Sequence, residues 1–254
     1  MILRNALEGQ TRRRTVEVLK LRGGSHLKGE HLFTIHAGTG LVVVPQEAVS
    51  LEYHVSGIRL TSGLPELDAM CRGGFYDKSL VLVTGATGTG KSLLATHFIA
   101  GGVAAGQRAL LHSFEESRNQ LVRNAARWGH DFERMEADGA LRIVAEAPEA
   151  QSLEDHLLRM KEEIAEFRPD RIAIDSLTAL QRIATARSFR EYLLGLSFHV
   201  KTRAVVGMVT AATEELGGGT MSGELHVSTV SDTIVVLQYV GRGAEIARGL
   251  VVLK

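Results

Sequence analysis

Gly85-Ala86-Thr87-Gly88-Thr89-Gly90-Lys91-Ser92 is the stretch that decides the fold of this 254-residue chain. It has the form G-x-x-x-x-G-K-[ST] of a phosphate-binding loop, or P-loop. The apolar run 80–83 before it is typical of a buried strand, and residues 93–99 after it suit a helix. In that order, backbone N–H groups and the helix N-terminus face phosphate oxygens. The expected nucleotide-binding residues are Gly85, Thr87, Gly88, Thr89, Gly90, Lys91, Ser92 and Leu93.

Two side chains of the loop have expected roles of their own. Lys91 should reach the β- and γ-phosphates of ATP, and the Ser92 hydroxyl should hold Mg²⁺. A glycine-rich turn without function is the alternative interpretation. The agreement of strand, loop, Lys-Ser pair and helix argues against that alternative.

The composition places the chain among ordinary soluble globular proteins, with 44% hydrophobic and 23% charged residues. The net charge of +0 provides no general attraction to nucleic acid or to an anionic membrane. Cys71 is the only cysteine, which excludes an internal disulfide and favours a reducing compartment. No apolar run reaches the length of a membrane span, and the N-terminus lacks a signal-peptide pattern. We therefore expect a cytoplasmic protein without a membrane-embedded part.

Strand and helix patterns alternate from residue 58 to residue 254. Strands are predicted at 80–83, 109–114, 141–144, 171–174, 204–210, 232–240 and 246–253. Helices are predicted after the P-loop, up to Trp128, over 152–167 and near 188–202. This alternation predicts an α/β fold with a mainly parallel sheet and helices on both faces. The last two strands are separated by a short turn at 241–243, so we expect them to be antiparallel.

Residues 1–44 have a different pattern, with three short predicted strands at 15–22, 32–35 and 41–44. Residues 45–57 are predicted to be a linker. The run 16–20, Val-Glu-Val-Leu-Lys, resembles the run 250–254, Leu-Val-Val-Leu-Lys. We therefore interpret 1–44 as the β-rich C-terminal tail of a preceding, equivalent domain, and 58–254 as a second domain truncated at its C-terminus. The second copy ends before an equivalent of Arg22, from which we expect poor assembly and slow turnover of this chain.

Acidic residues follow two of the predicted strands, at the edge where open α/β sheets bind ligands. Asp175 follows 171–174 in the form of a Walker B motif, and is expected to hold Mg²⁺ directly or through water. A helix N-cap is the alternative role for Asp175. Glu115 is the candidate general base, with Glu116 orienting it or a metal-bound water. A solvated loop is the alternative for this pair. The expected metal-holding residues are Ser92, Glu115 and Asp175.

Five spaced segments together resemble the KaiC family, and in particular its second RecA-like P-loop NTPase domain. They are the P-loop run 84–92, Glu-Glu-Ser-Arg at 115–118, Asn-Ala-Ala-Arg-Trp-Gly at 124–129, Arg-Ile-Ala-Ile-Asp-Ser-Leu at 171–177 and His-Val-Ser-Thr-Val-Ser-Asp-Thr at 226–233. The resemblance covers nearly all of 58–254, and residues 12–35 resemble the end of the family's first domain. It implies an ATP-binding, ring-forming circadian clock protein with Mg-dependent ATPase and Ser/Thr autokinase activity.

The resemblance also implies residue roles and partners. Ser228 and Thr229 match the family's phosphorylated pair, Glu115 its general base and Trp128 a nucleotide-contacting position. Positions that match contacts to a neighbouring subunit's nucleotide are Arg248 and Lys254, with Lys20, Arg22 and His26 as the equivalent set of the first domain. A homohexamer is implied, together with KaiB-like or signalling proteins as partners. Gly223 stands where the family has another threonine near the phosphosites.

Two other functions compete with this interpretation. A RecA- or RadA-type DNA-dependent ATPase would use Arg182, Arg187 and Arg190 with the loop at Gly217 to contact DNA phosphates. Zero net charge and the absence of interleaved aromatic and basic residues argue against DNA as a partner. The other alternative is an ATP-gated scaffold with negligible turnover, which the sequence leaves open.

Overall fold

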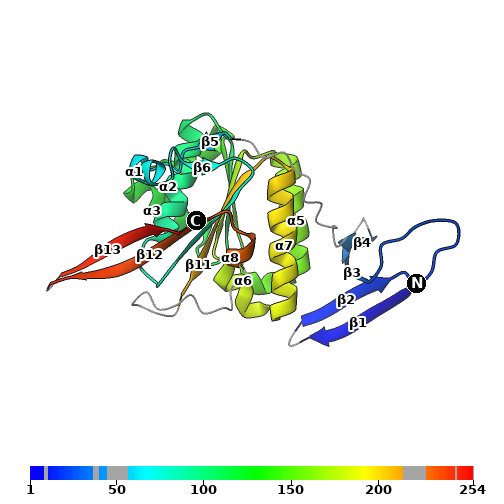
Figure 1. Cartoon of the computed structure of the whole chain (residues 1–254). Helices are drawn as coiled ribbons and strands as arrows, with labels where there is room; N and C mark the ends of the chain where they lie inside the picture. The colour runs from blue at the N-terminus through cyan, green and yellow to red at the C-terminus, as the bar shows by residue number, and fades with distance from the viewer. Residues whose placement is uncertain (9–10, 37–39, 45–56, 214–226, 244, 254) are drawn as a thin grey trace.

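A seven-stranded sheet forms the centre of the computed structural model, which describes residues 1–8, 11–36, 40–44, 57–213, 227–243 and 245–253 (Figure 1). The strand order is β13-β12-β7-β11-β10-β8-β9, and every neighbouring pair is parallel except β12 with β13. The strands are β7 (Leu80–Gly85), β8 (Ala109–Ser113), β9 (Leu141–Ala145), β10 (Arg171–Asp175), β11 (Val206–Ala212), β12 (Thr233–Arg242) and β13 (Glu245–Val252). The expected mainly parallel sheet with an antiparallel final pair is confirmed.

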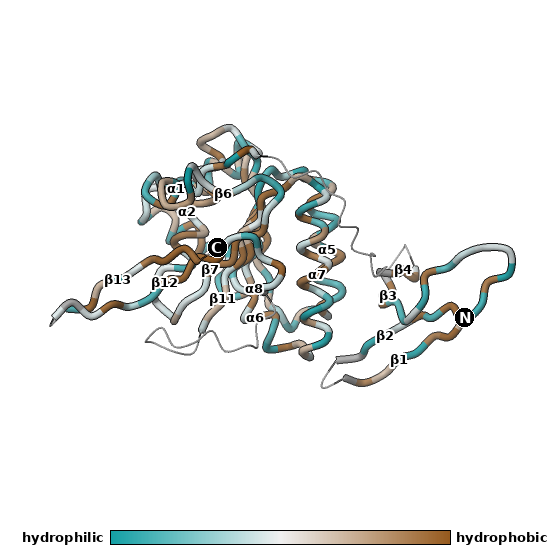
Figure 2. Tube along the Cα trace, viewed as in Figure 1, coloured by the Kyte–Doolittle hydropathy of each residue, from teal (hydrophilic) through white to brown (hydrophobic). Residues whose placement is uncertain are grey.

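Helices cover both faces of this sheet, as predicted (Figure 1). One face carries α1 (Pro65–Met70), α2 (Lys91–Ala104), α3 (Arg118–Arg127) and α4 (Phe132–Ala137). The other carries α5 (Leu153–Phe167), α6 (Leu177–Ile183) and α7 (Ala186–Thr202). Each helix packs apolar side chains on the central strands, which are the most hydrophobic part of the chain (Figure 2). The sheet is therefore buried on both faces, and a ligand can bind at the carboxyl ends of its strands.

Several short elements were not predicted from the sequence. They are α4, α6, the two-stranded pair β5 (Arg59–Leu60) and β6 (Phe75–Tyr76), and the 3₁₀ turn η1 (Pro148–Ala150). Each of these has seven residues or fewer. A hydrophobic period is detected only over a longer window, so such elements leave little periodic signal.

The N-terminal segment forms a separate antiparallel sheet of four strands in the order β1-β2-β3-β4. The strands are β1 (Ile2–Glu8), β2 (Thr11–Glu17), β3 (Glu30–His36) and β4 (Gly40–Val44). The prediction of three strands was wrong here, because it missed β1 and extended the second strand to residue 22. Glu17 pairs with Ile2, the first residue of β1, and with Glu30, the first residue of β3. Beyond Glu17, β2 therefore has no neighbouring strand to pair with. Leu19 and Leu21 continue the alternating pattern but lie exposed outside the sheet.

The hairpins β1–β2 and β12–β13 contain the two copies of the sequence repeat at similar positions. The shift that takes Val16 to Leu250 also takes Thr11–Glu17 to 245–251, which lies within β13. Both are second strands of an antiparallel pair. The two strands therefore occupy equivalent positions of the sequence repeat.

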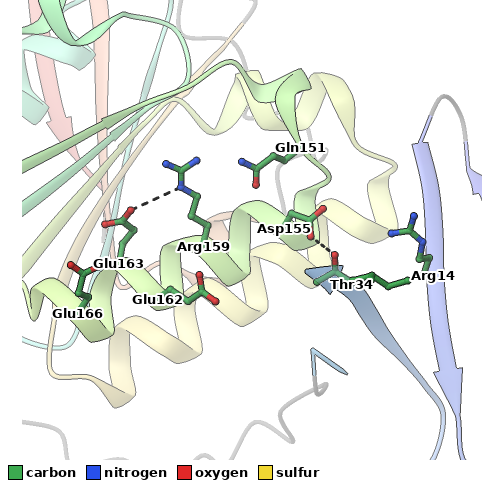
Figure 3. A pocket seen from close by; sticks show the side chains of 9 residues that line it. Arg14, Thr34, Gln151, Asp155, Arg159, Glu162, Glu163 and Glu166 are labelled. Atoms are coloured by element: carbon green, nitrogen blue, oxygen red, sulfur yellow. Dashed lines mark hydrogen bonds and ion pairs between the residues drawn. The ribbon is translucent and has the colours of Figure 1, made fainter. Parts of the chain in front are cut away.

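The N-terminal sheet contacts the α5–α7 face of the main domain. Arg13, whose side chain is buried, forms an ion pair with Glu191 of α7 at 3.0 Å. Thr34 of β3 donates a hydrogen bond to Asp155 of α5 at 2.5 Å. Beside this contact lies a polar groove of about 540 Å³ (Figure 3). It is lined by Arg14, Thr34, Ile35, Gln151, Asp155, Arg159, Glu162, Glu163 and Glu166, none of which belongs to the predicted nucleotide site.

Among the described residues, no helix has both the length and the apolar character needed to cross a membrane.

Candidate nucleotide site

The P-loop lies between β7 and α2, and two of its glycines are required by close backbone or side-chain neighbours. A Cβ on Gly85 would lie 2.1 Å from the backbone oxygen of Leu237 in β12. Gly88 has a φ of +80°, and a Cβ there would lie 2.8 Å from the Tyr239 hydroxyl. That hydroxyl also lies 3.4 Å from the Thr87 carbonyl oxygen, to which it donates. The loop is therefore held against β12 by contacts that only glycine permits.

Lys91 is folded over the loop that it follows. Its ammonium donates to the carbonyl oxygens of Gly85 at 2.8 Å and Ala86 at 2.9 Å. Burial lowers the pKa of Lys91, whereas the carboxylates of Asp175 and Glu115 act to raise this pKa. Glu115 follows β8 and Asp175 ends β10, and the carboxyl ends of both strands lie at the same end of the sheet as the P-loop.

The carboxyl ends of β7, β8 and β10 lie at the same edge of the sheet, and each acidic residue there has a specific partner. Asp175, the last residue of β10, is buried and accepts a hydrogen bond from Thr210 of β11. Glu115 accepts from the Ser176 hydroxyl at 2.8 Å. The N-cap position of α6 belongs to Ser176, so the alternative role of Asp175 as that cap is wrong.

Glu116 is half-buried and accepts a hydrogen bond from the Asn124 side chain at 2.7 Å. Burial raises its pKa first, and the negative charges of Asp175 and Glu115 raise it further, while Asn124 opposes these effects. The strand register also brings these carboxylates together, because Asp175 pairs with Ser113, two residues before Glu115. A divalent cation placed between them would relieve the repulsion between their charges.

The residues at this edge fit Mg²⁺ bound together with phosphate oxygens. Mg²⁺ prefers hard oxygen ligands and commonly takes one or two carboxylates plus the phosphates of its substrate. Ser92 in the first turn of α2 and the buried Asp175 supply such oxygens. Within the described ranges no three or more His, Cys, Asp or Glu side chains form a metal site by themselves. This donor set would therefore hold Mg²⁺ only with nucleotide present.

The other P-loop candidates lie where the motif predicts. Thr89 is buried and donates its hydroxyl to the Ala86 carbonyl at 2.8 Å, whereas Thr87 is exposed at the loop tip. Gly90 is the N-cap of α2, and Leu93 is in its first turn. The side chain of Thr89 thus shapes the loop from inside, and backbone groups near Thr87 remain open to a ligand.

Trp128 is the C-cap of α3 and is half-buried, so it is not a core residue. Within the described part of the chain, no hydrogen bond or ring contact joins its side chain to the P-loop. Its loop is connected to the P-loop helix through His130, whose Nε2 lies 3.0 Å from Nδ1 of His97 in α2. The predicted contact of Trp128 with nucleotide therefore stays a prediction.

The residues predicted to reach a neighbouring subunit's nucleotide are spread over two regions. Arg248 is exposed on β13, directly across from Tyr239 of β12. Lys20 and Arg22 are exposed and His26 is half-buried between β2 and β3, in the N-terminal part that contacts the α5–α7 face. The structure does not bring this second group to the P-loop of its own chain. Lys254 lies outside the described residues, as do Gly217 and Gly223.

The predicted phosphorylation pair lies on a short helix, α8 (Val227–Val230). The end of α8 is held next to the start of β7, where the backbone N–H of Asp232 donates to the Leu80 carbonyl at 2.8 Å. Gly85 lies five residues farther along β7, or about 17 Å at 3.3 Å per residue. The pair and the P-loop of the same chain thus lie at opposite ends of β7.

Sequence reasoning missed four residues that organise the site: Asn124, Ser176, Thr210 and Tyr239. Ser176 directly follows the predicted Walker B aspartate, so a search of the strand ends for hydroxyl groups identifies it. Thr210 and Tyr239 are far from their partners in sequence, and no local pattern indicates either contact.

Comparison with known proteins gives one consistent result. Residues 60–254 match a sequence model described as the KaiC ATPase. The chain is 50% identical over 254 residues to the circadian clock protein KaiC3 of Synechocystis sp., covering 100% of this chain and 50% of that protein. It is 48% identical over 254 residues to the circadian clock oscillator protein KaiC of Thermostichus vulcanus and to KaiC 1 of Synechocystis sp., covering 49% of each. The chain thus spans about half the length of the curated relatives that it matches.

Proposed function

Because this chain belongs to the KaiC ATPase family, we propose that it is the ATP-hydrolysing and autophosphorylating part of a longer, ring-forming regulatory protein. The observation that carries the proposal is that Lys91, Asp175 and Glu115 lie at or after the ends of strands whose carboxyl ends lie at the same end of the sheet. A phosphate-binding cation and two carboxylates are the groups that phosphoryl transfer from ATP requires. The interpretation of 1–44 as the tail of an equivalent domain belongs to the same proposal.

Each residue has a role that follows from its place. Backbone N–H groups of the P-loop and the N-terminus of α2 bind the phosphates, and Lys91 balances charge on the β- and γ-phosphates. Asp175 and Ser92 would hold Mg²⁺, which would supply positive charge to the phosphate oxygens. Glu115 is exposed at the strand end and accepts the proton of the attacking water or hydroxyl.

Substitution of Glu115 tests this assignment, and Glu116 offers a matched control. A base acts in the transition state, so Glu115→Gln should lower turnover at least about 100-fold while ATP affinity changes little. Glu116→Gln removes a neighbouring charge of the same kind and should lower turnover much less. Equal loss of turnover in the two variants, or loss of ATP affinity in Glu115→Gln, would contradict the role of Glu115.

We propose Ser228 and Thr229 as the hydroxyls that receive the γ-phosphate. Attack requires a hydroxyl within about 3–3.5 Å of the phosphorus, and α8 lies at the opposite end of β7 from the P-loop of its own chain. This separation supports transfer between neighbouring protomers of a ring, for which Arg248 is the proposed contact with the neighbour's nucleotide. We propose a ring of six copies, with KaiB-like or signalling proteins as its partners.

The transfer is tested by mixing two variants of the full-length protein. A Lys91→Ala protein keeps both hydroxyls but lacks the P-loop lysine, and a Ser228→Ala, Thr229→Ala protein keeps only the ATP site. With γ-labelled ATP, mixed rings should carry label on the first protein at Ser228 or Thr229. Label that appears only in rings of wild-type protein would refute transfer between protomers.

A further inference from the structure

Ser176 occupies a helix N-cap without capping the helix. It precedes α6 with extended backbone angles, φ −128° and ψ 156°, which are typical of an N-cap residue. A serine there normally accepts a hydrogen bond from a backbone N–H in the first helical turn. Its side chain makes no such bond. The hydroxyl instead donates to Oε1 of Glu115, 2.8 Å away and 61 positions earlier in the sequence.

Three other helices of the same chain have the N-cap hydrogen bond that Ser176 does not make. The caps of α3, α5 and α7 are Ser117, Ser152 and Thr185, and each accepts from a backbone N–H three residues ahead. A cap of this kind typically contributes about 1 kcal/mol to helix stability. Departures from a local rule of this kind are expected at functional sites. The hydroxyl of Ser176 is therefore better explained by its bond to Glu115 than by the helix that it precedes.

We propose that Ser176 is a positioning residue, which holds the carboxylate of Glu115 in the orientation needed to accept a proton during ATP turnover. The inference rests on the proposed role of Glu115 as the base. Ser176 is 2% exposed and fixed between β10 and α6, whereas Glu115 is exposed and has three rotatable side-chain bonds. The bond to Oε1 restricts the rotamers of this side chain, and in the proposal Oε2 is the oxygen that accepts the reacting proton.

The test is a double-mutant cycle in the full-length protein, measured as kcat and as the Kd for ATP. Ser176→Ala should lower kcat about 10- to 100-fold, because a base displaced by about 1 Å loses that much. The Kd should stay within about twofold, because Ser176 does not touch the P-loop. In a Glu115→Gln background, Ser176→Ala should produce no further loss of kcat, because the group that it positions is already absent.

Thermal unfolding of the same variants separates positioning from helix stability. Ser152→Ala is the matched control, since it removes a hydroxyl that does cap a helix. It should lower the melting temperature and leave kcat unchanged. Ser176→Ala should instead lower kcat and leave the melting temperature unchanged.

Wild-type kcat in Ser176→Ala, or a kcat loss that persists in full in the Glu115→Gln background, would overturn the role of Ser176 alone. Wild-type turnover in Glu115→Gln would overturn the base assignment and this inference together. The two failures are therefore distinguished by the single variants.

Discussion

His112 is expected to make the stability of this protein depend on pH below neutrality. It lies on β8 with 1% of its surface exposed, and both ring nitrogens lack a hydrogen-bond partner among the described residues. Burial, together with the charges of Arg159 and His156, lowers the pKa of His112 to about 3. The ring is therefore neutral in the folded state, at pH values where the unfolded chain binds a proton.

The sign and size of the effect follow from proton linkage. The folded pKa lies below the unfolded value of 6.5, so the unfolded state binds more protons and stability falls as the pH falls. The contribution is fully present above pH 6.5 and is lost progressively toward the folded pKa of about 3. Between pH 7.5 and 5.0 the loss is about 2 kcal/mol. Any folded pKa below about 4 gives the same loss, because the ring is then still neutral at pH 5.0.

The perturbation is His112→Phe, which removes the titrating group and two buried nitrogens without hydrogen bonds. Burying such groups costs about 1–3 kcal/mol, so the variant should be at least as stable as the wild type at pH 7.5. Its advantage should grow by about 2 kcal/mol at pH 5.0, which corresponds to roughly 4–8 °C in melting temperature for a domain of this size.

Urea unfolding of both proteins at the two pH values measures this difference. Leu110→Val is the control, since it alters the same strand and the same core without a titrating group. Its destabilisation should be equal at pH 7.5 and 5.0. If the difference between His112→Phe and the wild type is also equal at both pH values, the neutral buried histidine is refuted.

Three further predictions concern the P-loop and the N-terminal sheet. Lys91→Ala should weaken ATP binding about 10- to 100-fold, measured by competition with a fluorescent nucleotide, because a charge-assisted contact is lost; unchanged affinity would place the nucleotide elsewhere. Gly88→Ala should also weaken binding, because a left-handed φ costs about 1–2 kcal/mol and the new Cβ meets Tyr239; adding Tyr239→Phe should relieve the contact and recover only part of the affinity. Arg13→Ala should speed proteolytic release of the N-terminal segment, whereas Arg187→Ala, which removes an exposed ion pair to the same carboxylate, should not.

The alternative of a DNA-dependent ATPase gains no support from the arginines on which it depended. Arg187 is engaged with Glu191 at 3.0 Å, in a pair of the kind found along solvated helices. Arg182 and Arg190 are exposed on α6 and α7, and the Gly217 loop lies outside the described residues. Binding of single-stranded DNA that falls steeply with salt and stimulates ATP turnover would favour this alternative.

The sequence alone determined the class of fold, the P-loop and the acidic strand ends. Each of these features depends on residues that are adjacent in the sequence. They are a motif of eight positions, apolar runs of strand length and an amphipathic helix such as 153–167. The parallel sheet was predictable as well. Neighbouring strands that are connected by a helix can run in the same direction, because the helix brings the chain back to the starting end of the sheet. Chemistry at the carboxyl ends of 109–113 and 171–175 was predictable for that reason.

The tertiary structure decided which groups meet at that edge. Thr210 contacts Asp175 across 35 positions, Ser176 contacts Glu115 across 61, and Tyr239 contacts the P-loop across 152. Such pairs depend on the order of strands in the sheet and on which face each side chain occupies, and neither is encoded locally. The position of α8 is of the same kind. This helix lies beyond the start of β7, because β12 runs parallel to β7 and α8 precedes β12.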